Sequence, residues 1–154
     1  MKKNFLNLSV LSFAVLSFTG SILLTGCGKG AVTYKDGTYE GKSEVHESED
    51  GSDNGNGYGV VNITIESGKI TECTYKTYET DGTPKDEDYG KENGRIANKD
   101  YYNKAQKANA ACSEYASMLV ANGGLDGIDA ISGATINYDE FVEAVDNALR
   151  EAEE

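Results

Sequence analysis

Residues 129–135 (Asp-Ala-Ile-Ser-Gly-Ala-Thr) have the types and spacing best suited to binding chemistry in this chain. Ser132 and Thr135 supply hydroxyls, and Gly133 permits a sharp or left-handed turn. A predicted helix follows, so its free N–H groups and the positive end of its dipole point back at the turn. This arrangement suits an anion such as a phosphate. From the pattern alone, an ordinary loop that leads into a helix is the simpler interpretation.

An antiparallel sheet is predicted upstream of this segment. Apolar residues favour strands in three segments, with the clearest alternation in the second; the segments are 37–45, 58–66 and 69–79. Ser67-Gly68 is a two-residue turn signal that should join the last two segments as a hairpin. Residues 46–57 and 80–97 are rich in turn-forming residues, and a loop as long as 80–97 is usually functional or disordered.

Two helices are predicted after the sheet, at about 100–121 and 138–152, because apolar residues recur there at helical spacing. Asn137 and Glu140 form an N-x-x-E pattern, which predicts Asn137 as the N-cap of the second helix. Strands followed by helices indicate an α+β fold. We therefore expect a small, hairpin-rich antiparallel sheet followed by two helices in a single domain.

The beginning of the chain has the pattern of a targeting segment. Lys2 and Lys3 precede an uncharged, mainly apolar run that ends in Leu-Thr-Gly-Cys, which resembles a bacterial lipobox. The resemblance implies a signal peptide at 1–26, lipidation of Cys27 and a lipidated tether at 27–36. The domain at 37–152 would then lie on the extracytoplasmic face of the cell membrane. An uncleaved membrane anchor is the alternative, since about 20 apolar residues can span a bilayer.

Composition excludes several classes of function. The 154-residue chain has a formal net charge of −12, which argues against a nucleic-acid partner. His46 is the only histidine, so a two-histidine metal site is excluded and no metal is expected. P-loop and nucleophile-elbow motifs are also absent from the sequence. Cys73 and Cys112 are interpreted as small buried residues, in preference to a disulfide between them, although export would permit a disulfide.

The segment at 129–135 is similar to the signature of the FMN-binding domain family. Further similarity at 36–41, 57–59 and the predicted hairpin extends the resemblance over about 36–149. The segments 85–91 and 101–106 resemble the surface-lipoprotein subgroup of flavin-based extracellular electron transfer. The resemblance implies a covalent FMN phosphoester on Thr135, formed by an exported flavin transferase. It assigns the remaining positions to the phosphate-side loop and to transferase recognition: Ser132, Gly133 and Ala134 to the loop, and Asp129 to recognition. Family members often have Ser or Thr where this chain has Asn137.

The same resemblance implies an electron carrier rather than an enzyme. Electrons would come from a membrane quinone or an NADH-dehydrogenase-type donor and pass to soluble extracellular acceptors. Three tyrosines in or beside the Gly-rich loops are candidates to stack on the flavin, with half-buried structural roles as the alternative: Tyr58, Tyr78 and Tyr89. The many carboxylates predict a rather low flavin potential.

Two other functions remain open from the sequence. Asn137 departs from the family pattern, which motivates a surface-lipoprotein binding module that holds a ligand or partner protein without flavin. The long 80–97 loop motivates a flavin-dependent reductase in which this loop covers a specific small acceptor.

Overall fold

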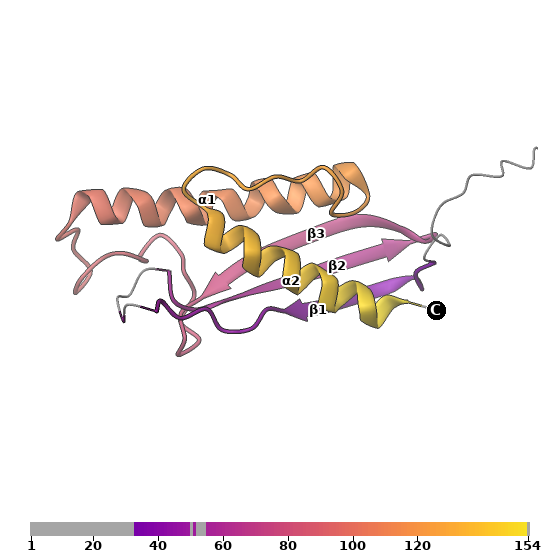
Figure 1. Ribbon diagram of the computed structural model, residues 1–154, viewed down its shortest axis with the longest axis horizontal. Coiled ribbons are helices and arrows are strands. Elements are labelled where there is room, and N and C mark those ends of the chain that lie inside the picture. Colours follow the sequence, from indigo (N-terminus) through magenta and orange to yellow (C-terminus); the bar gives the residue numbers. More distant parts are fainter. Residues whose placement is uncertain (1–32, 50, 52–54, 154) are drawn as a thin grey trace, which may run out of the picture. The chain divides into compact units, whose positions relative to one another are not determined.

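The sheet has three strands, followed by two helices. The computed structural model (Figure 1) describes residues 33–49, 51 and 55–153. The elements follow in the order β1 (Gly37–Lys42), β2 (Tyr58–Glu66), β3 (Lys69–Tyr78), α1 (Lys99–Asn122) and α2 (Thr135–Ala152). The strands pair in the order β1-β2-β3, and all pairs are antiparallel. The predicted α+β arrangement is confirmed. The predicted signal peptide at 1–26 and the predicted lipidation site Cys27 lie outside the described residues.

The β2–β3 hairpin forms as its sequence predicts. Ser67 and Gly68 have φ values of 53° and 71°, so both turn residues adopt the left-handed conformation of a type I′ turn. The ladder places Gly59 opposite Thr77 and Ile63 opposite Cys73, with a register shift between Thr64 and Ile65. Strand β1 ends at Lys42, three residues before the predicted end at Val45.

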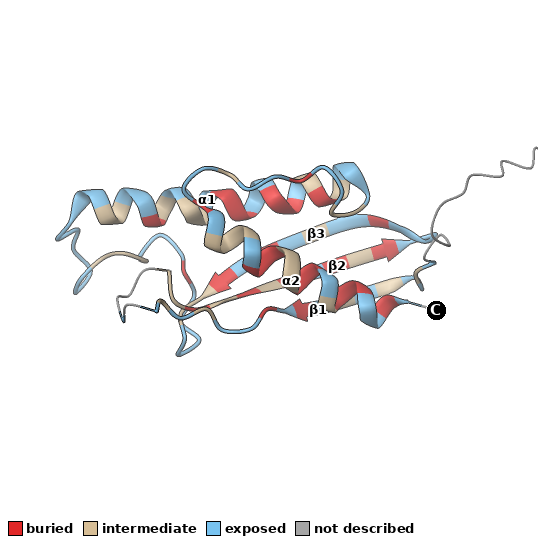
Figure 2. Ribbon diagram, in the orientation of Figure 1, coloured by how far each residue is buried: buried red, intermediate tan, exposed pale blue. Residues whose placement is uncertain are grey.

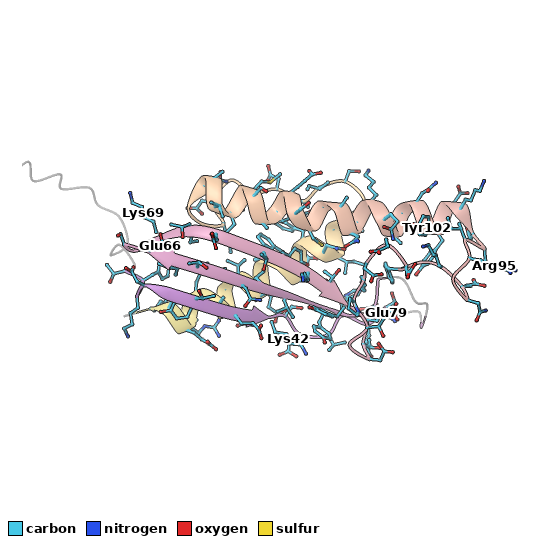
Figure 3. All side chains as sticks on the ribbon, turned by 180° about the vertical axis from the view of Figure 1, so that it is seen from behind. Lys42, Glu66, Lys69, Glu79, Arg95 and Tyr102 are labelled. Carbon is cyan, nitrogen blue, oxygen red and sulfur yellow. The ribbon has the colours of Figure 1, made fainter. Side chains whose placement is uncertain are left out.

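Both helices cover the same face of the sheet. Helix α1 packs against β3, whereas α2 packs against β1 and β2. In Figure 3, seen from the opposite side, the sheet lies in front of α2. The core between these layers contains Val61, Ile63 and Ile65 of β2, each at most 1 % exposed. Figure 2 shows the buried segments along the strands and on both helices.

The close approach of α2 to β1 depends on Gly41. A Cβ atom added there would lie 2.6 Å from the backbone nitrogen of Ala148 and 2.8 Å from its Cβ. The absence of a side chain on Gly41 therefore lets the helix lie directly on the strand.

Helix α1 begins and ends with recognisable caps. The side chain of Asn98 accepts hydrogen bonds of 3.1 Å from the backbone N–H groups of Asp100 and Tyr101. Gly123 adopts a left-handed conformation and donates its N–H to the carbonyl of Leu119. Both ends lie within one residue of the predicted bounds.

The predicted start of α2 is wrong. The helix begins at Thr135, its N-cap is Ala134, and no side chain caps it. Asn137 lies inside the first turn, where its amide donates to the Ala108 carbonyl at 3.2 Å and to Cys112 Sγ at 3.3 Å. Glu140 is buried rather than folded back onto the helix start. Packing against α1 and the sheet has overridden the local capping preference of these two side chains.

Neither helix of the described residues combines the length and apolar character that a membrane crossing requires.

Candidate functional site

A cavity of about 490 Å³ lies at the N-terminal end of α2. Its walls come from the first half of α1, the segment 133–137, the end of β3, the loop that follows β3, and Gly55. Its volume falls within the range of about 300–1,000 Å³ that is usual for small-molecule sites. Thr135 is exposed and lines this cavity at the first residue of the helix.

The turn that presents Thr135 is held from within the core. Gly133 has a φ of 86°, a conformation that favours glycine. The N–H of Ala134 donates to the carbonyl of Ile131 at 2.9 Å. Tyr115 of α1, fully buried, accepts the Ile131 N–H through its hydroxyl and donates to the Ala134 carbonyl. The turn therefore rests on a rigid core side chain as well as on its own backbone.

Positive charge surrounds the cavity, although the chain as a whole is strongly acidic. Lys85, Lys104 and Lys107 are wall residues, and no wall residue that the structure describes is acidic. A Cβ added to Gly133 would lie 3.6 Å from Lys107 Nζ, so this ammonium group lies beside the turn. The lysines and the start of α2 together favour an anionic ligand group next to Thr135.

Lys85 is buried, with 7 % of its surface exposed. Its Nζ donates to the Gly55 carbonyl at 2.9 Å and lies 5.3 Å from the ring centroid of Tyr89. A Cβ added to Gly57 would lie 2.9 Å from the same Nζ and would collide with the Tyr78 carbonyl. Gly57 therefore leaves the space in which the lysine reaches the cavity.

Helix α1 fixes the first part of the loop after β3. The Gln106 amide donates to the carbonyls of Asp86 and Tyr89, both at 2.9 Å. The Tyr102 hydroxyl donates to the Glu87 carbonyl at 3.1 Å. These bonds hold Tyr89 at the cavity wall and tie this half of the 80–97 segment to the helix.

The structure gathers some of the predicted site residues and separates others. Gly133, Ala134, Thr135 and Tyr89 line the cavity. Ser132 and Asp129 are exposed on the same connection but are not wall residues.

Tyr58 and Tyr78 lie away from the cavity. Their neighbours Gly59 and Thr77 are buried under the helices, so strand alternation places the two tyrosines on the open face of the sheet. Their rings stack on each other, with centroids 5.4 Å apart, and Lys42 Nζ lies 3.6 Å from the Tyr58 centroid. Tyr89 is thus the one predicted stacking tyrosine that reaches the cavity wall.

Sequence reasoning missed Tyr101, Lys85, Lys104 and Lys107 as wall residues. The three α1 residues could have been found from helical spacing, since Lys104 and Lys107 are three apart and Tyr101 precedes them by three. No spacing pattern in the sequence indicated Lys85 as a wall residue. It stands in an acidic loop, and the path of this loop is set by tertiary contacts with β3 and α1.

Buried polar side chains lie in the cavity wall and directly behind it. Thr77 of the wall and Glu140 behind it are buried, and no well-formed hydrogen bond reaches their side-chain oxygens within the described part of the chain. The Tyr75 hydroxyl donates to the Asn137 carbonyl at 2.7 Å. Burial raises the pKa of Glu140 to about 7, while Lys85 acts in the opposite direction.

Cys73 and Cys112 are free thiols. Cys112 is buried, as expected, whereas Cys73 is half-buried on β3. Burial raises the pKa of Cys73 to about 12 and also raises that of Cys112. Both groups are therefore protonated, unreactive thiols at neutral pH.

Comparison with known proteins gives a family and a fold. The sequence model of the FMN-binding domain matches residues 54–150. No match was found among curated proteins. The crystal structure of the CPE2226 protein from Clostridium perfringens is similar, with 21 % identity, a TM-score of 0.55, and coverage of 77 % of this chain and 88 % of that one. A solution structure from Clostridium thermocellum has 25 % identity, a TM-score of 0.40, and coverage of 78 % and 93 %.

Proposed function

The chain belongs to the FMN-binding domain family, and on that premise we propose that it is an electron carrier with FMN bound covalently to Thr135. The observation that carries this proposal is the position of Thr135. Its exposed side chain lies at the wall of the lysine-flanked cavity, at the first residue of α2. A phosphoester at this hydroxyl would place the phosphate beside the helix N-terminus.

The residues around the cavity fit FMN in three respects. Lys107 beside Gly133, together with the start of α2, suits the phosphate. Tyr89 and Tyr101 offer aromatic surface in the wall, which suits a flat ring system. Thr77 supplies a buried hydroxyl that lacks a partner among the described residues and can bond a polar edge of a ligand.

FMN, when bound, supplies the redox chemistry by accepting and donating electrons. The protein's own contribution is positioning and electrostatics. The bond between Tyr115 and the Ala134 carbonyl holds the turn that presents Thr135. Gln106 fixes Tyr89 at the wall. The lysines balance the negative charge of a phosphate and of a reduced ring.

We further propose that the protein works outside the cytoplasmic membrane, anchored by lipid on Cys27. The lipobox-like sequence at 24–27 supports this placement. A covalent cofactor suits such a location, because a reversibly bound one would be lost where its free concentration is low. An exported flavin transferase would load the protein. A membrane quinol (the reduced form of a membrane quinone) or an NADH-dehydrogenase-type donor would then reduce it, and soluble acceptors would reoxidise it.

The direct test is intact mass together with flavin fluorescence after denaturation. Wild type, Thr135→Val and Thr74→Val would each be coexpressed with an exported flavin transferase. Thr74 is an exposed threonine of β3 and serves as the matched control. We expect covalent flavin in wild type and in the control, and none in Thr135→Val. Flavin retained by Thr135→Val would refute the attachment residue.

A protein that binds a partner without flavin is the competing function. Asn137 motivated it, yet the Asn137 amide is engaged with Ala108 and Cys112 of α1. Asn137, where family members often have Ser or Thr, therefore has a structural role in this chain, because it joins the first turn of α2 to α1. Wild type that stays free of flavin in the experiment above would favour the binding module.

A further inference from the structure

Glu140 lies directly behind two residues of the cavity wall. It is 4 % exposed and is the only buried carboxyl of the described residues. Asn137, one turn earlier on α2, is a wall residue. On the sheet side, a Cβ added to Gly59 would lie 3.1 Å from Glu140 Cβ, and Gly59 pairs with the wall residue Thr77.

This carboxyl is poorly satisfied where it lies. Neither oxygen makes a well-formed hydrogen bond within the described part of the chain, since the nearby Tyr75 hydroxyl donates to the Asn137 carbonyl and offsets only part of the effect of burial on the carboxyl. An unpartnered carboxylate is costly to bury, so burial raises the pKa of Glu140 to about 7. A group of this kind can change its protonation state in response to a small change in nearby charge.

The groups that face Glu140 come from four parts of the chain. Tyr75 of β3 and Cys112 of α1 are neutral at pH 7 because burial raises the pKa of both groups. Lys85 of the loop after β3 attracts the carboxylate, and Asp139 of α2 repels it. Lys85 also lines the cavity, so it is the cation that the cavity and the buried carboxyl share.

We propose that Glu140 takes up a proton when flavin in this cavity is reduced and releases it when the flavin is reoxidised. The proposal rests on the proposed function, since it requires bound flavin. Negative charge added to the cavity repels the Glu140 carboxylate and so offsets the attraction that Lys85 exerts on it. The carboxyl is then more stable in its protonated form. Glu140 responds electrostatically to the charge in the cavity, without contact with the flavin.

The step balances with a quinol-type donor. The quinol releases two electrons and two protons as it is oxidised to the quinone. The flavin takes both electrons and one proton, and the second proton forms an O–H bond on Glu140. The net charge of the cavity and its wall is therefore unchanged. On reoxidation the acceptor takes the electrons, and both protons return to solvent as the O–H bond of Glu140 breaks.

Glu140→Gln tests the proposal, with Asp146→Asn as the matched control. The control removes a carboxylate from an exposed position of the same helix that is not among the charges facing Glu140. Flavin content is measured first in all three proteins. The slope of the flavin midpoint potential against pH, measured around pH 8, then gives the protons taken up per two electrons, because Glu140 with a pKa of about 7 is largely ionised there in the oxidised protein. We expect close to two in wild type and in Asp146→Asn, and close to one in Glu140→Gln.

Infrared difference spectra of the reduced and oxidised proteins provide a second readout. We expect a protonated-carboxyl band on reduction in wild type that is missing from Glu140→Gln. If Glu140→Gln does not fold, the shift of this band in wild type labelled with ¹³C-glutamate assigns it to a glutamate, and Glu140 is the only buried carboxyl of the described residues. Equal slopes in wild type and Glu140→Gln, or no such band in wild type, would overturn the role of Glu140 while leaving the carrier intact. Absence of flavin from wild type would overturn both proposals.

Discussion

The hydroxyl of Tyr115 donates a 3.2 Å hydrogen bond to the carbonyl of Ala134, the residue immediately before Thr135. The same hydroxyl accepts a 2.7 Å bond from the N–H of Ile131. Tyr115 belongs to α1 and is fully buried, so the core of the domain holds both ends of the turn. The position of Thr135 at the cavity is thereby linked to the packing of α1.

Tyr115→Phe should loosen this turn and reduce flavin loading. The substitution keeps the ring but leaves two backbone groups without their partner, which costs about 1–3 kcal/mol for each group that stays buried and unsatisfied. We expect a lower urea midpoint and several-fold less covalent flavin after coexpression with the transferase. Tyr39→Phe is the control, because its hydroxyl bonds the exposed Lys35 carbonyl far along the chain from the turn. Normal loading in a destabilised Tyr115→Phe would show that the turn keeps its shape without the hydroxyl.

Glu140 should make the stability of the flavin-free protein fall as pH rises. The pKa of its carboxyl is about 7 in the fold against an ordinary value of 4.5, so between these values the folded state binds the extra proton. Stability should decline from pH 4.5 to 7 and level off above. The pKa difference corresponds to about 3 kcal/mol.

Urea unfolding at several pH values checks this expectation. The contribution should vanish in Glu140→Gln, which should be more stable than wild type at pH 8. Asp146→Asn should keep the wild-type decline. A Glu140→Gln profile that runs parallel to the wild-type profile would contradict the expectation.

Lys85→Met should lower the flavin midpoint potential. Lys85 is buried at the cavity wall, and a buried charge is screened less by solvent than exposed carboxylates are. The overall charge of the chain predicts a low potential, but the three wall lysines oppose that tendency at short range. Loss of one of them should make reduction harder. Spectroelectrochemistry measures the change, with Lys76→Met, exposed on β3, as the control. An unchanged potential would mean that Lys85 does not act on the flavin.

Gly41→Ala should destabilise the fold strongly, because the new methyl group would meet the backbone of α2 where the helix lies on β1. Overpacking of this kind costs about 1–3 kcal/mol, and more where the obstacle is backbone. Gly124→Ala is the matched control, since no atom lies within 4 Å of the added methyl group. Chemical unfolding of both variants measures the difference. Equal midpoints would show that α2 can shift away from the sheet at little cost.

Much of the fold could be read from the sequence because its signals are local. Alternation in 58–66 and the turn at Ser67-Gly68 both depend on neighbouring residues, and the structure confirms both. The start of α2 could not be predicted this way. Asn137 has the right type and spacing for a cap, but its amide bonds α1 instead, and the helix begins at Thr135, three residues before the predicted start.

The candidate site, like the fold, could be predicted only where its residues are neighbours in the chain. The sequence by itself marked the 129–135 turn, since hydroxyls, a glycine and a following helix are contiguous in the chain, and its resemblance to the FMN-binding domain signature singled out Thr135. Only the tertiary structure decided which distant residues join them. It brings Lys85 to the cavity through a bond from its N–H to the Thr77 carbonyl of β3, and Tyr89 through a bond from Gln106 of α1. It turns Tyr58 and Tyr78 to the other face of the sheet. The physical reason is that a side chain's neighbours across the core depend on strand register and helix packing, which no local pattern specifies.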